Sequence, residues 1–420
     1  MTDNLWAWLS LALIAALVLV IWSIRRHRSP ILQVQTDCGI EQLMPSLSGL
    51  TLSTPVEGNS VQVLENGGFY DVLEQRIRAA QRSVHFETFL WKPGKLGDRM
   101  AAAFIDRARA GVPVRITLDA QGCKTLEKDQ VARMREAGCK LKFFHKHSIY
   151  TIGVMNDRTH RKICILDGSE AFVGGHCITD DWLGDAEDHQ HNSDVSVWLH
   201  GPIVHSIQGC FSENWAGETG ELFVGDEYFP VLQKAGNISV HAAFAKPENS
   251  APAVKILHHT ALCLARRKIW IQNPYFIPKQ EAIAAFGTAV KRGVDVRVLM
   301  PSTSGSDSPL VQHAGHYHFE QLLKLGVRLF EYPHTLLHQK VMTIDGCWSA
   351  VGSTNFDDRS FDTNDEVTVG ILDEGITAQL DAIFEKYCRR AEEIKLEKWR
   401  KRSVFIKVKD NAAYLLNDLL

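Results

Sequence analysis

The sequence lacks an excess of positive charge and lacks paired cysteines. Its 420 residues carry 46 lysines and arginines against 49 aspartates and glutamates, a net charge of −3. This balance gives no overall attraction toward nucleic acid, which normally needs a basic face, and it weakens a nuclease interpretation. The nine cysteines are an odd number without CxxC pairs, as is typical of free thiols in a reducing compartment. We therefore expect the soluble part of the chain to face the cytoplasm.

One long apolar run stands near the N-terminus. Residues 5–24, LWAWLSLALIAALVLVIWSI, contain no charged residue, and 20 residues is about the length that a helix needs to cross a membrane. Asp3 precedes the run, and three arginines within residues 25–28 follow it, which is the opposite of the pattern of a cleaved signal peptide. The positive-inside rule predicts a single-pass anchor over residues 1–28 with the rest of the chain in the cytoplasm.

The remainder of the chain repeats one pattern of elements twice. Helix, glycine and strand follow one another in RARAGVPVRITLD (107–119) and again in AVKRGVDVRVLMP (289–301). Regular alternation of helices and strands indicates an α/β unit with a parallel or mixed sheet. The sequence therefore predicts two similar α/β domains, over residues 61–225 and 254–390.

The other segments are expected to connect or flank these domains. Residues 29–60 lack clear periodicity and are interpreted as a linker, and residues 226–253 as a connector. Residues 391–420 carry basic residues around Trp399 before a leucine-rich end. This tail is amphipathic, and we expect it either to lie on an anionic membrane surface or to dock on the preceding domain.

Each predicted domain contains one strand with charged residues at a fixed spacing. Both strands read His-x-Lys, four residues and then Asp: His160, Lys162 and Asp167 in THRKICILD, and His338, Lys340 and Asp345 in LHQKVMTIDG. Burying a polar group without a partner costs about 2–7 kcal/mol, and an ion costs more, so the repetition indicates a function. Two similar halves resemble a fused homodimer, whose symmetry axis brings the same patch of each half face to face. We therefore expect the two motif strands to line one cleft between the halves.

Paired histidines and lysines suit a reaction at a phosphodiester. One neutral imidazole can attack phosphorus and form a phosphohistidine, while the other, protonated, donates its proton to the departing alcohol. The lysines supply positive charge, and a unit-charge contact at ~4 Å is worth about 4 kcal/mol at an effective dielectric of 20. We therefore expect neither a metal nor a cofactor in the cleft.

Four acidic residues are assigned to two supporting roles. Asp194 and Glu366 each open a strand, 34 and 28 residues after the histidine of the same half. Each is expected to accept the ring N–H of that histidine and so to fix its tautomer and orientation. Asp167 and Asp345 end their strands, and we expect them to stabilise the turn there.

Turns that follow the motif strands carry candidate phosphate-binding groups. Gly174 and Gly175 lie in FVGGHCITDDW, and Ser353 and Asn355 lie in AVGSTNFDDRSF. Glycine lets a backbone approach a ligand closely, and N–H groups on such turns can bind phosphate oxygens. We therefore expect these four residues to contact the phosphate of the substrate.

The doubled motif, with GSTNFDDRSFDTNDE after its second copy, resembles the phospholipase D superfamily, and within it the bacterial cardiolipin synthases, over roughly residues 60–390. The resemblance implies two phospholipase D-type α/β halves packed as a pseudo-dimer, with both motifs, aspartates included, in the active site between them. It implies His160 as the nucleophile and His338 as the acid, with the reverse assignment open. Where the family usually has Asn after the paired glycines, this chain has His176.

The same resemblance implies the reaction and the location. A phosphatidyl group would pass from one phosphatidylglycerol to another through a phosphatidyl-histidine, with release of glycerol, at the inner membrane of a bacterium. The substrates would be phospholipids, without cofactor or nucleic acid; the acceptor lipid and the oligomeric state stay open.

Three alternative functions are considered. A phospholipase D would differ only in that water reaches the intermediate, whereas a nuclease would favour a basic cleft and need no membrane anchor. A membrane-tethered binding protein with an inactive site is disfavoured because both motifs are intact. Separately, the run DAEDHQHNSD (185–194) holds two histidines among carboxylates, but without an ordered ligand spacing it is typical of a solvated loop.

Overall fold

The computed structural model of the chain describes residues 6, 8–16, 38–51, 53–145, 157–246 and 252–415. The chain divides into two units, residues 1–33 and 34–420. In the first unit residues 8–16 are helical, and half of the predicted membrane span 5–24 falls outside the described residues. Within the described part of the chain, no helix has both the length and the apolar character needed to cross a membrane.

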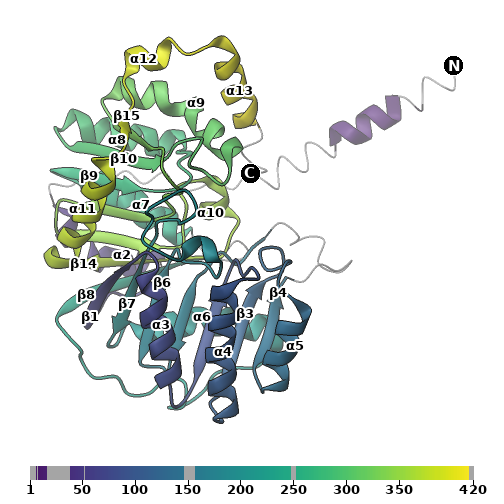
Figure 1. The fold of residues 1–420 in the computed structure, drawn as a ribbon. Helices are drawn as coiled ribbons and strands as arrows, with labels where there is room; N and C mark the ends of the chain where they lie inside the picture. Colours follow the sequence, from purple (N-terminus) through teal and green to yellow (C-terminus); the bar gives the residue numbers. More distant parts are fainter. Residues whose placement is uncertain are drawn as a thin grey trace. The chain divides into compact units, whose positions relative to one another are not determined.

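Residues 34–420 are built around one sheet of 15 strands (Figure 1). The first half supplies β1 (Val56–Glu65), β2 (Val84–Thr88), β3 (Val114–Asp119), β4 (Lys140–Phe144), β5 (Ile163–Leu166), β6 (Glu170–Gly174) and β7 (Val195–His200). The second half supplies β8 (Ile238–Ala245), β9 (Lys268–Gln272), β10 (Asp295–Pro301), β11 (Arg328–Tyr332), β12 (Val341–Ile344), β13 (Trp348–Gly352), β14 (Glu366–Leu372) and β15 (Glu392–Glu393).

The strand order shows the internal repeat directly. It is β15-β11-β10-β9-β12-β13-β14-β8-β1-β7-β6-β5-β2-β3-β4. Outward from the antiparallel contact of β1 with β8, both halves have the same order, so that β1, β7, β6, β5, β2, β3 and β4 match β8, β14, β13, β12, β9, β10 and β11. The prediction of a repeated, mixed α/β unit is confirmed.

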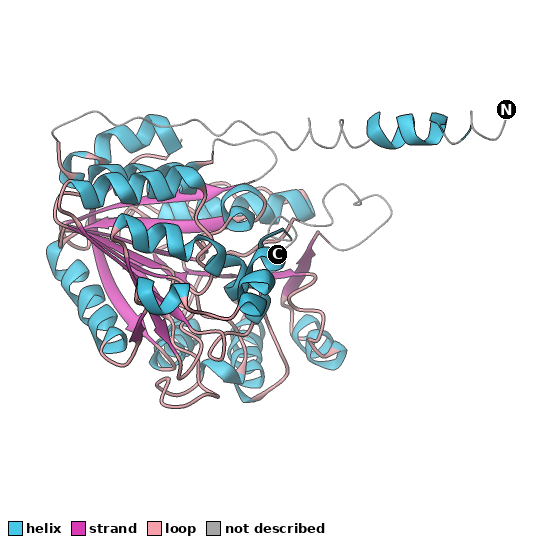
Figure 2. Ribbon diagram, turned by 90° about the horizontal axis from the view of Figure 1, so that it is seen from above, coloured by secondary structure: helices cyan, strands magenta, loops and turns pink. Residues whose placement is uncertain are grey.

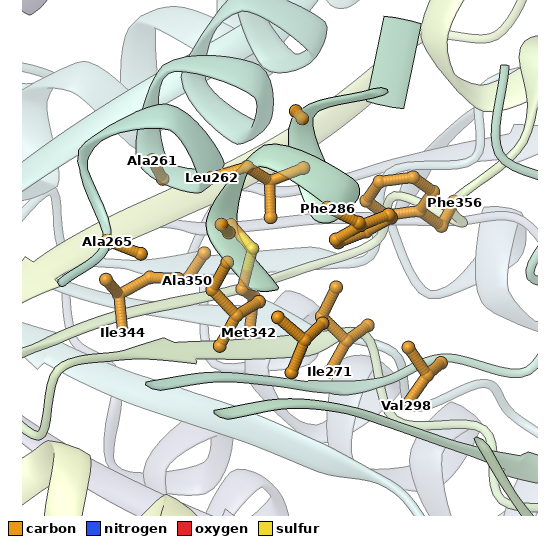
Figure 3. Packing of buried hydrophobic residues seen from close by; sticks show 14 of the residues in the cluster. Ala261, Leu262, Ala265, Ile271, Phe286, Val298, Met342, Ile344, Ala350 and Phe356 are labelled. Carbon is orange, nitrogen blue, oxygen red and sulfur yellow. The ribbon is translucent and has the colours of Figure 1, made fainter. Parts of the chain in front are cut away.

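Helices cover the faces of this sheet (Figure 2). In chain order the short helices and α-helices are η1 (Ile40–Gln42), α2 (Met44–Thr51), α3 (Gly68–Ala79), α4 (Lys95–Arg109), α5 (Lys128–Glu136), η3 (Asp180–Trp182), α6 (Val204–Thr219), α7 (Ala253–Leu264), α8 (Gln280–Lys291), α9 (Pro309–Leu325), α10 (Asp358–Asp362), α11 (Glu374–Cys388), α12 (Leu396–Arg400) and α13 (Val404–Leu415). Side chains of α3, α4 and α5 share one apolar cluster with β2 and β3, and side chains of α2, α7, α8 and α9 share another with β9 and β10. Figure 3 shows part of the second cluster, in which Phe286 of α8 lies by Phe356.

A third cluster joins the two halves. Ile163 and Ile165 of β5 pack in it together with Val341 of β12, Val351 of β13 and α6 and α11. Because side chains alternate along a strand, the remaining apolar residues of β5 point the other way, into the cluster of the first half. The two motif strands therefore meet across a shared core, which brings the preceding histidines to one place.

Three segments expected to connect or trail the domains contain regular elements. Residues 29–60 include α2, whose Leu47 is buried against the second half, and the start of β1. Residues 226–253 include β8, which pairs with both β1 and β14. Residues 391–420 include α12 and α13, and α12 buries Trp399 in the core of the second half. These elements were not predicted because their apolar runs are short and are interrupted by Gly, Ser and Pro.

Candidate active site

Both motif histidines lie on extended segments whose backbone contacts the opposite half of the molecule. Thr159, just before His160, forms a parallel bridge with Asp365, and Ser193 forms one with Leu337, just before His338. The His160 N–H donates to the Asp365 carbonyl at 2.9 Å, and the His338 N–H donates to the Ser193 carbonyl at 2.7 Å. The backbone itself therefore fixes each histidine against a segment of the other half.

The orienting carboxylates are exchanged between the halves. His160 Nδ1 lies 2.9 Å from Glu366 Oε1, and His338 Nδ1 lies 2.7 Å from Asp194 Oδ2. The prediction that each carboxylate serves the histidine of its own half is wrong. Within one half, β5 and β7 run parallel with β6 between them, a separation of about 10 Å at ~4.8 Å per strand. Among the residues that the structure describes, the carboxylate within hydrogen-bonding distance of each ring comes from the opposite half.

Each orienting carboxylate is fully buried and held by further donors. The Ser353 hydroxyl donates to Glu366, and the Trp182 indole N–H donates to Asp194 Oδ2 at 2.9 Å. Burial raises the pKa of Asp194 above its ordinary value. Burial acts in the same direction on Glu366, but His160 and Lys162 outweigh it and lower the pKa of that carboxyl. A carboxylate accepts hydrogen bonds, so the proton of each ring stays on Nδ1 and leaves Nε2 for chemistry.

Burial also decides the charge of the two rings. It lowers the pKa of His160 to about 4, with Glu366 opposing that shift. Burial, together with Lys340 and Lys162, lowers the pKa of His338 well below its ordinary value. Both imidazoles are therefore neutral near pH 7 before a substrate arrives, and a nucleophilic ring needs this state.

The two lysines make different contacts with their histidines. Lys162 Nζ donates to the His160 carbonyl at 2.6 Å, whereas Lys340 Nζ lies 2.8 Å from both His338 Nε2 and the His338 carbonyl. Burial lowers the pKa of Lys340 to about 7 and also lowers that of Lys162. Among the described residues, none forms a hydrogen bond with His160 Nε2. The halves therefore share residues but differ in how each reactive nitrogen is held.

The motif aspartates lie at the far ends of their strands. Asp167 has a φ of +57° and accepts the N–H groups of residues 81–83, and Asp345 has a φ of +55° and accepts those of residues 266–268. Each carboxylate ties the turn after β5 or β12 to the start of β2 or β9. The expected turn role is supported, and neither aspartate lines the cleft, contrary to what the resemblance implies.

Asp167→Ala should destabilise the protein by about 2–4 kcal/mol, because three backbone N–H groups lose a charged acceptor and alanine is strained at positive φ. Asp167→Asn keeps one acceptor oxygen and tolerates this backbone, so its loss should be about 1 kcal/mol. Urea unfolding measures both. The turnover of the folded fraction should stay unchanged, and a fall in turnover without a stability loss would assign Asp167 a direct catalytic role.

Three of the four predicted phosphate-binding residues are otherwise engaged. The N–H groups of Gly174 and Gly175 donate to the carbonyls of Lys162 and Val195 at 3.4 and 3.3 Å. A Cβ on Gly175 would lie 2.3 Å from Asp194 Oδ1, so this glycine makes room for the orienting carboxylate. Ser353, its counterpart in the repeat, supports Glu366 by its hydroxyl. Only Asn355 lines the cleft.

His176 points away from the cleft. Its Nδ1 lies 2.7 Å from Ser196 Oγ, its Nε2 lies 3.0 Å from the Asn66 carbonyl, and its ring stacks on Phe69 at 4.2 Å. Ile178 and Phe356 form equivalent bridges in the two halves, and this register matches Cys177 with Asn355. The departure from the family pattern at the cleft is therefore Cys177. Sequence reasoning missed it, although aligning GGHCI with GSTNF would have revealed it.

One cleft of about 430 Å³ receives both histidines. Its apolar wall is formed by Phe89, Leu90, Ile277 and Val311. Its polar groups include Arg158 and Arg359, which sequence reasoning also missed because they lie outside the repeated spacing. The cleft therefore combines two imidazoles, cationic side chains and an apolar wall, a set of groups that suits a lipid phosphodiester.

Comparison with solved structures supports the fold. A phosphatidylserine synthase from Haemophilus influenzae Rd KW20 superposes with a TM-score of 0.68 at 13% identity, over 90% of this chain and 99% of that one. A polyphosphate kinase from Porphyromonas gingivalis gives a TM-score of 0.53 at 13% identity, over 87% of this chain and 52% of that one. At such identities these similarities concern the fold alone.

Comparison with known sequences identifies the family. The chain is 30% identical over 401 residues to a cardiolipin synthase of Geobacillus sp. (strain WCH70), covering 94% of this chain and 77% of that protein. It is 31% identical over 383 residues to cardiolipin synthase 2 of Bacillus anthracis, covering 90% and 74%. The family described as "Cardiolipin synthase, PLD-like domain" matches residues 73–215 and again residues 259–388. With one match in each half of the repeat, this chain belongs to the cardiolipin synthase family of phospholipase D-like proteins.

Proposed function

We propose that the protein is a phosphatidyltransferase that makes cardiolipin from two molecules of phosphatidylglycerol and releases glycerol. The observation that carries this proposal is the pair of exchanged histidine–carboxylate contacts that face one cleft. Two histidines with fixed tautomers supply a nucleophile and a proton carrier without a third reactive group.

In the first step His160 is the nucleophile. Its Nε2 lone pair forms a bond to phosphorus as the bond from phosphorus to the glycerol oxygen breaks. His338 donates a proton to that oxygen, so that neutral glycerol leaves and a phosphatidyl group stays on His160. Glu366 stabilises the positive charge that develops on the His160 ring. The absence of a hydrogen bond between His160 Nε2 and any described residue supports this assignment over the reverse one.

In the second step the roles of His338 and the alcohol reverse. The hydroxyl of a second phosphatidylglycerol gives its proton to His338 and forms the new bond to phosphorus. The bond from phosphorus to His160 Nε2 breaks and restores the neutral ring. Protons and bonds therefore balance over the cycle. Water in place of the second lipid would give phosphatidic acid instead.

The cationic side chains favour a charged phosphodiester. Lys162 and Lys340 stand beside the rings, and Arg158 and Arg359 line the same cleft. A bound phosphate anion favours the protonated forms of nearby groups, so it raises the pKa values that burial has lowered. His338 can thus become protonated when the substrate is present, although it is neutral in the free protein.

The rate should depend on pH through two groups of the free protein. Protonation of His160 removes the nucleophile, so kcat/KM should fall as the pH drops toward about 4. Lys340, with a pKa of about 7, is charged below that value and neutral above it, so kcat/KM should also fall as the pH rises through about 7. Lys340→Arg keeps its charge at every accessible pH and should remove the alkaline fall. An alkaline limb unchanged in Lys340→Arg would exclude Lys340 as its source.

We further propose that the protein works at an anionic bacterial inner membrane, with residues 5–24 as a single-pass anchor and α13 as a second contact. Val404, Phe405 and Val408 of α13 are more than half exposed and lie among basic residues. Apolar side chains flanked by lysines favour an anionic lipid surface.

The double variant Phe405→Ser, Val408→Ser of residues 34–420, the unit that contains the whole sheet, should sediment less with phosphatidylglycerol vesicles. Unchanged sedimentation, with unchanged circular dichroism, would remove α13 from the proposal.

Reconstitution of the full chain in phosphatidylglycerol liposomes tests the reaction. Cardiolipin and glycerol should appear in equal amounts, and phosphatidic acid should stay a minor product. Phosphatidic acid as the main product would identify a hydrolase and overturn the proposed synthesis. His338→Ala is the control for background lipid exchange.

A further inference from the structure

A cluster of metal-binding side chains lies outside the cleft, where α13 packs on α9. His313 and His316 are three residues apart on α9 and so share one face of the helix, and Asp410 comes from α13. All three residues are buried, with exposed fractions of 7%, 6% and 2%. Neither the repeat nor the reaction proposed for the cleft accounts for them.

The geometry of the cluster is close to that of a metal site. His313 Nδ1 lies 2.7 Å and His316 Nδ1 lies 3.5 Å from Asp410 Oδ1. One ligand atom from each residue can be chosen so that all three lie within 4.8 Å of one another. Around a tetrahedral zinc ion, ligand atoms at about 2.0–2.1 Å from the metal are ~3.3 Å apart. Shifts of about an ångström would therefore complete the site.

The surroundings match the outer shell of such a site. His316 Nε2 lies 2.8 Å from Glu331 Oε1, so the ring can donate there and present to a metal its buried Nδ1, which forms no hydrogen bond with any described residue. Arg402 binds Asp410 Oδ2 at 2.9 Å and leaves Oδ1 available. With two carboxylates and one guanidinium, the group has one net negative charge when both rings are neutral, so a divalent cation suits it.

We propose that His313 Nδ1, His316 Nδ1 and Asp410 Oδ1 bind one zinc ion that fastens α13 to α9. Two imidazoles and one carboxylate favour zinc over magnesium or calcium, which prefer oxygen ligands. Water supplies the fourth ligand. Because the ligands come from two helices far apart in the sequence, the ion holds the C-terminal helix in place and does not take part in the reaction of the cleft. The competing state is a plain ion pair between protonated histidine and Asp410.

Metal binding to the untagged full chain tests the site. After dialysis against a chelator, calorimetric titration with zinc should give one site per chain, and the thermal midpoint should rise with zinc. Cobalt in place of zinc should give the visible absorption of a tetrahedral nitrogen and oxygen site. A chain that binds no zinc, and whose cobalt spectrum is that of the aqueous ion, would establish the ion pair and overturn the proposal.

Variants locate the ion. His316→Ala and Asp410→Asn should each weaken zinc binding by at least about 100-fold, and Glu331→Gln, which removes the outer-shell partner, by about 10-fold. His318→Gln is the matched control, because His318 lies on the same helix but contacts Tyr414 instead, and it should keep the affinity of the unchanged chain. Equal zinc affinity in all four variants would place the ion elsewhere. The cobalt spectrum of the unchanged chain remains decisive if a variant does not fold.

Discussion

His160→Ala and His338→Ala should each lower cardiolipin formation by about 10³-fold or more while the protein stays folded, because each removes a group that reacts directly. Both rings are buried but already partnered, so alanine leaves an orphaned carboxylate and a small cavity rather than a disrupted core. Initial rates with phosphatidylglycerol vesicles measure the loss, and circular dichroism checks the fold. His205→Ala is a suitable control, because that ring contacts the Pro230 carbonyl and the Phe229 ring, neither of which belongs to the motifs. Near-normal turnover in either motif variant would exclude the mechanism.

The two variants also separate the nucleophile from the acid. A phosphatidyl donor with a good leaving group needs little protonation, so His338→Ala should still form a covalent adduct on His160 with such a donor. His160→Ala should form none. Acid-quenched samples analysed by mass spectrometry would show which histidine carries the phosphatidyl group. An adduct on His338 in the His160→Ala protein would reverse the assignment.

Much of the fold could be predicted because the repeat is visible in the sequence. The spacing shared by His160 and His338, and the matching helix, glycine and strand signals, predicted two similar halves and one cleft between them. The elements that escaped prediction are those whose burial depends on the partner half. β8 and α2 have short apolar patterns, and their place in the molecule comes from contacts with distant segments.

The site was predictable in its residues but not in their pairing. Sequence separation suggested that Asp194 serves His160, yet the strand between β5 and β7 keeps these two about 10 Å apart. Each histidine reaches the carboxylate of the other half because of two backbone bridges, Thr159 with Asp365 and Ser193 with Leu337. These bridges join segments far apart in the sequence, so no local sequence pattern predicts them. For the same reason the sequence predicts that Gly175 contacts a phosphate, whereas in the structure it makes room for the Asp194 carboxylate.

The exchanged contacts make each reactive unit depend on both halves. His160 needs Glu366, and His338 needs Asp194, so neither half alone contains a complete histidine–carboxylate pair. A gene duplication that fused the two subunits of a homodimer into one chain would keep such an exchange, because the symmetry axis of the homodimer passes between the two histidine–carboxylate pairs. The arrangement also couples the reactive groups to the packing of the two halves.

Glu366→Gln and Asp194→Asn should each lower turnover by roughly 10³ to 10⁴-fold, because an amide no longer holds the ring in the reactive tautomer or stabilises its charge. Glu374→Gln, an exposed change on α11 near Glu366 in the sequence, should leave the rate unaltered. Rates alone, however, do not distinguish histidine–carboxylate pairs exchanged between the halves from pairs within one half, since both arrangements predict a loss of turnover.

NMR titration of the imidazole signals makes that distinction, with each signal assigned by its absence in the alanine variant. Glu366 raises the pKa of His160 against the effect of burial, so Glu366→Gln should lower the pKa of His160 further below about 4. The tautomer signal of His160 should change, and that of His338 should not. Asp194→Asn should act on the His338 signal in the same selective way. Pairs within one half would give the opposite result, because Glu366→Gln would then alter His338 and leave His160 unchanged.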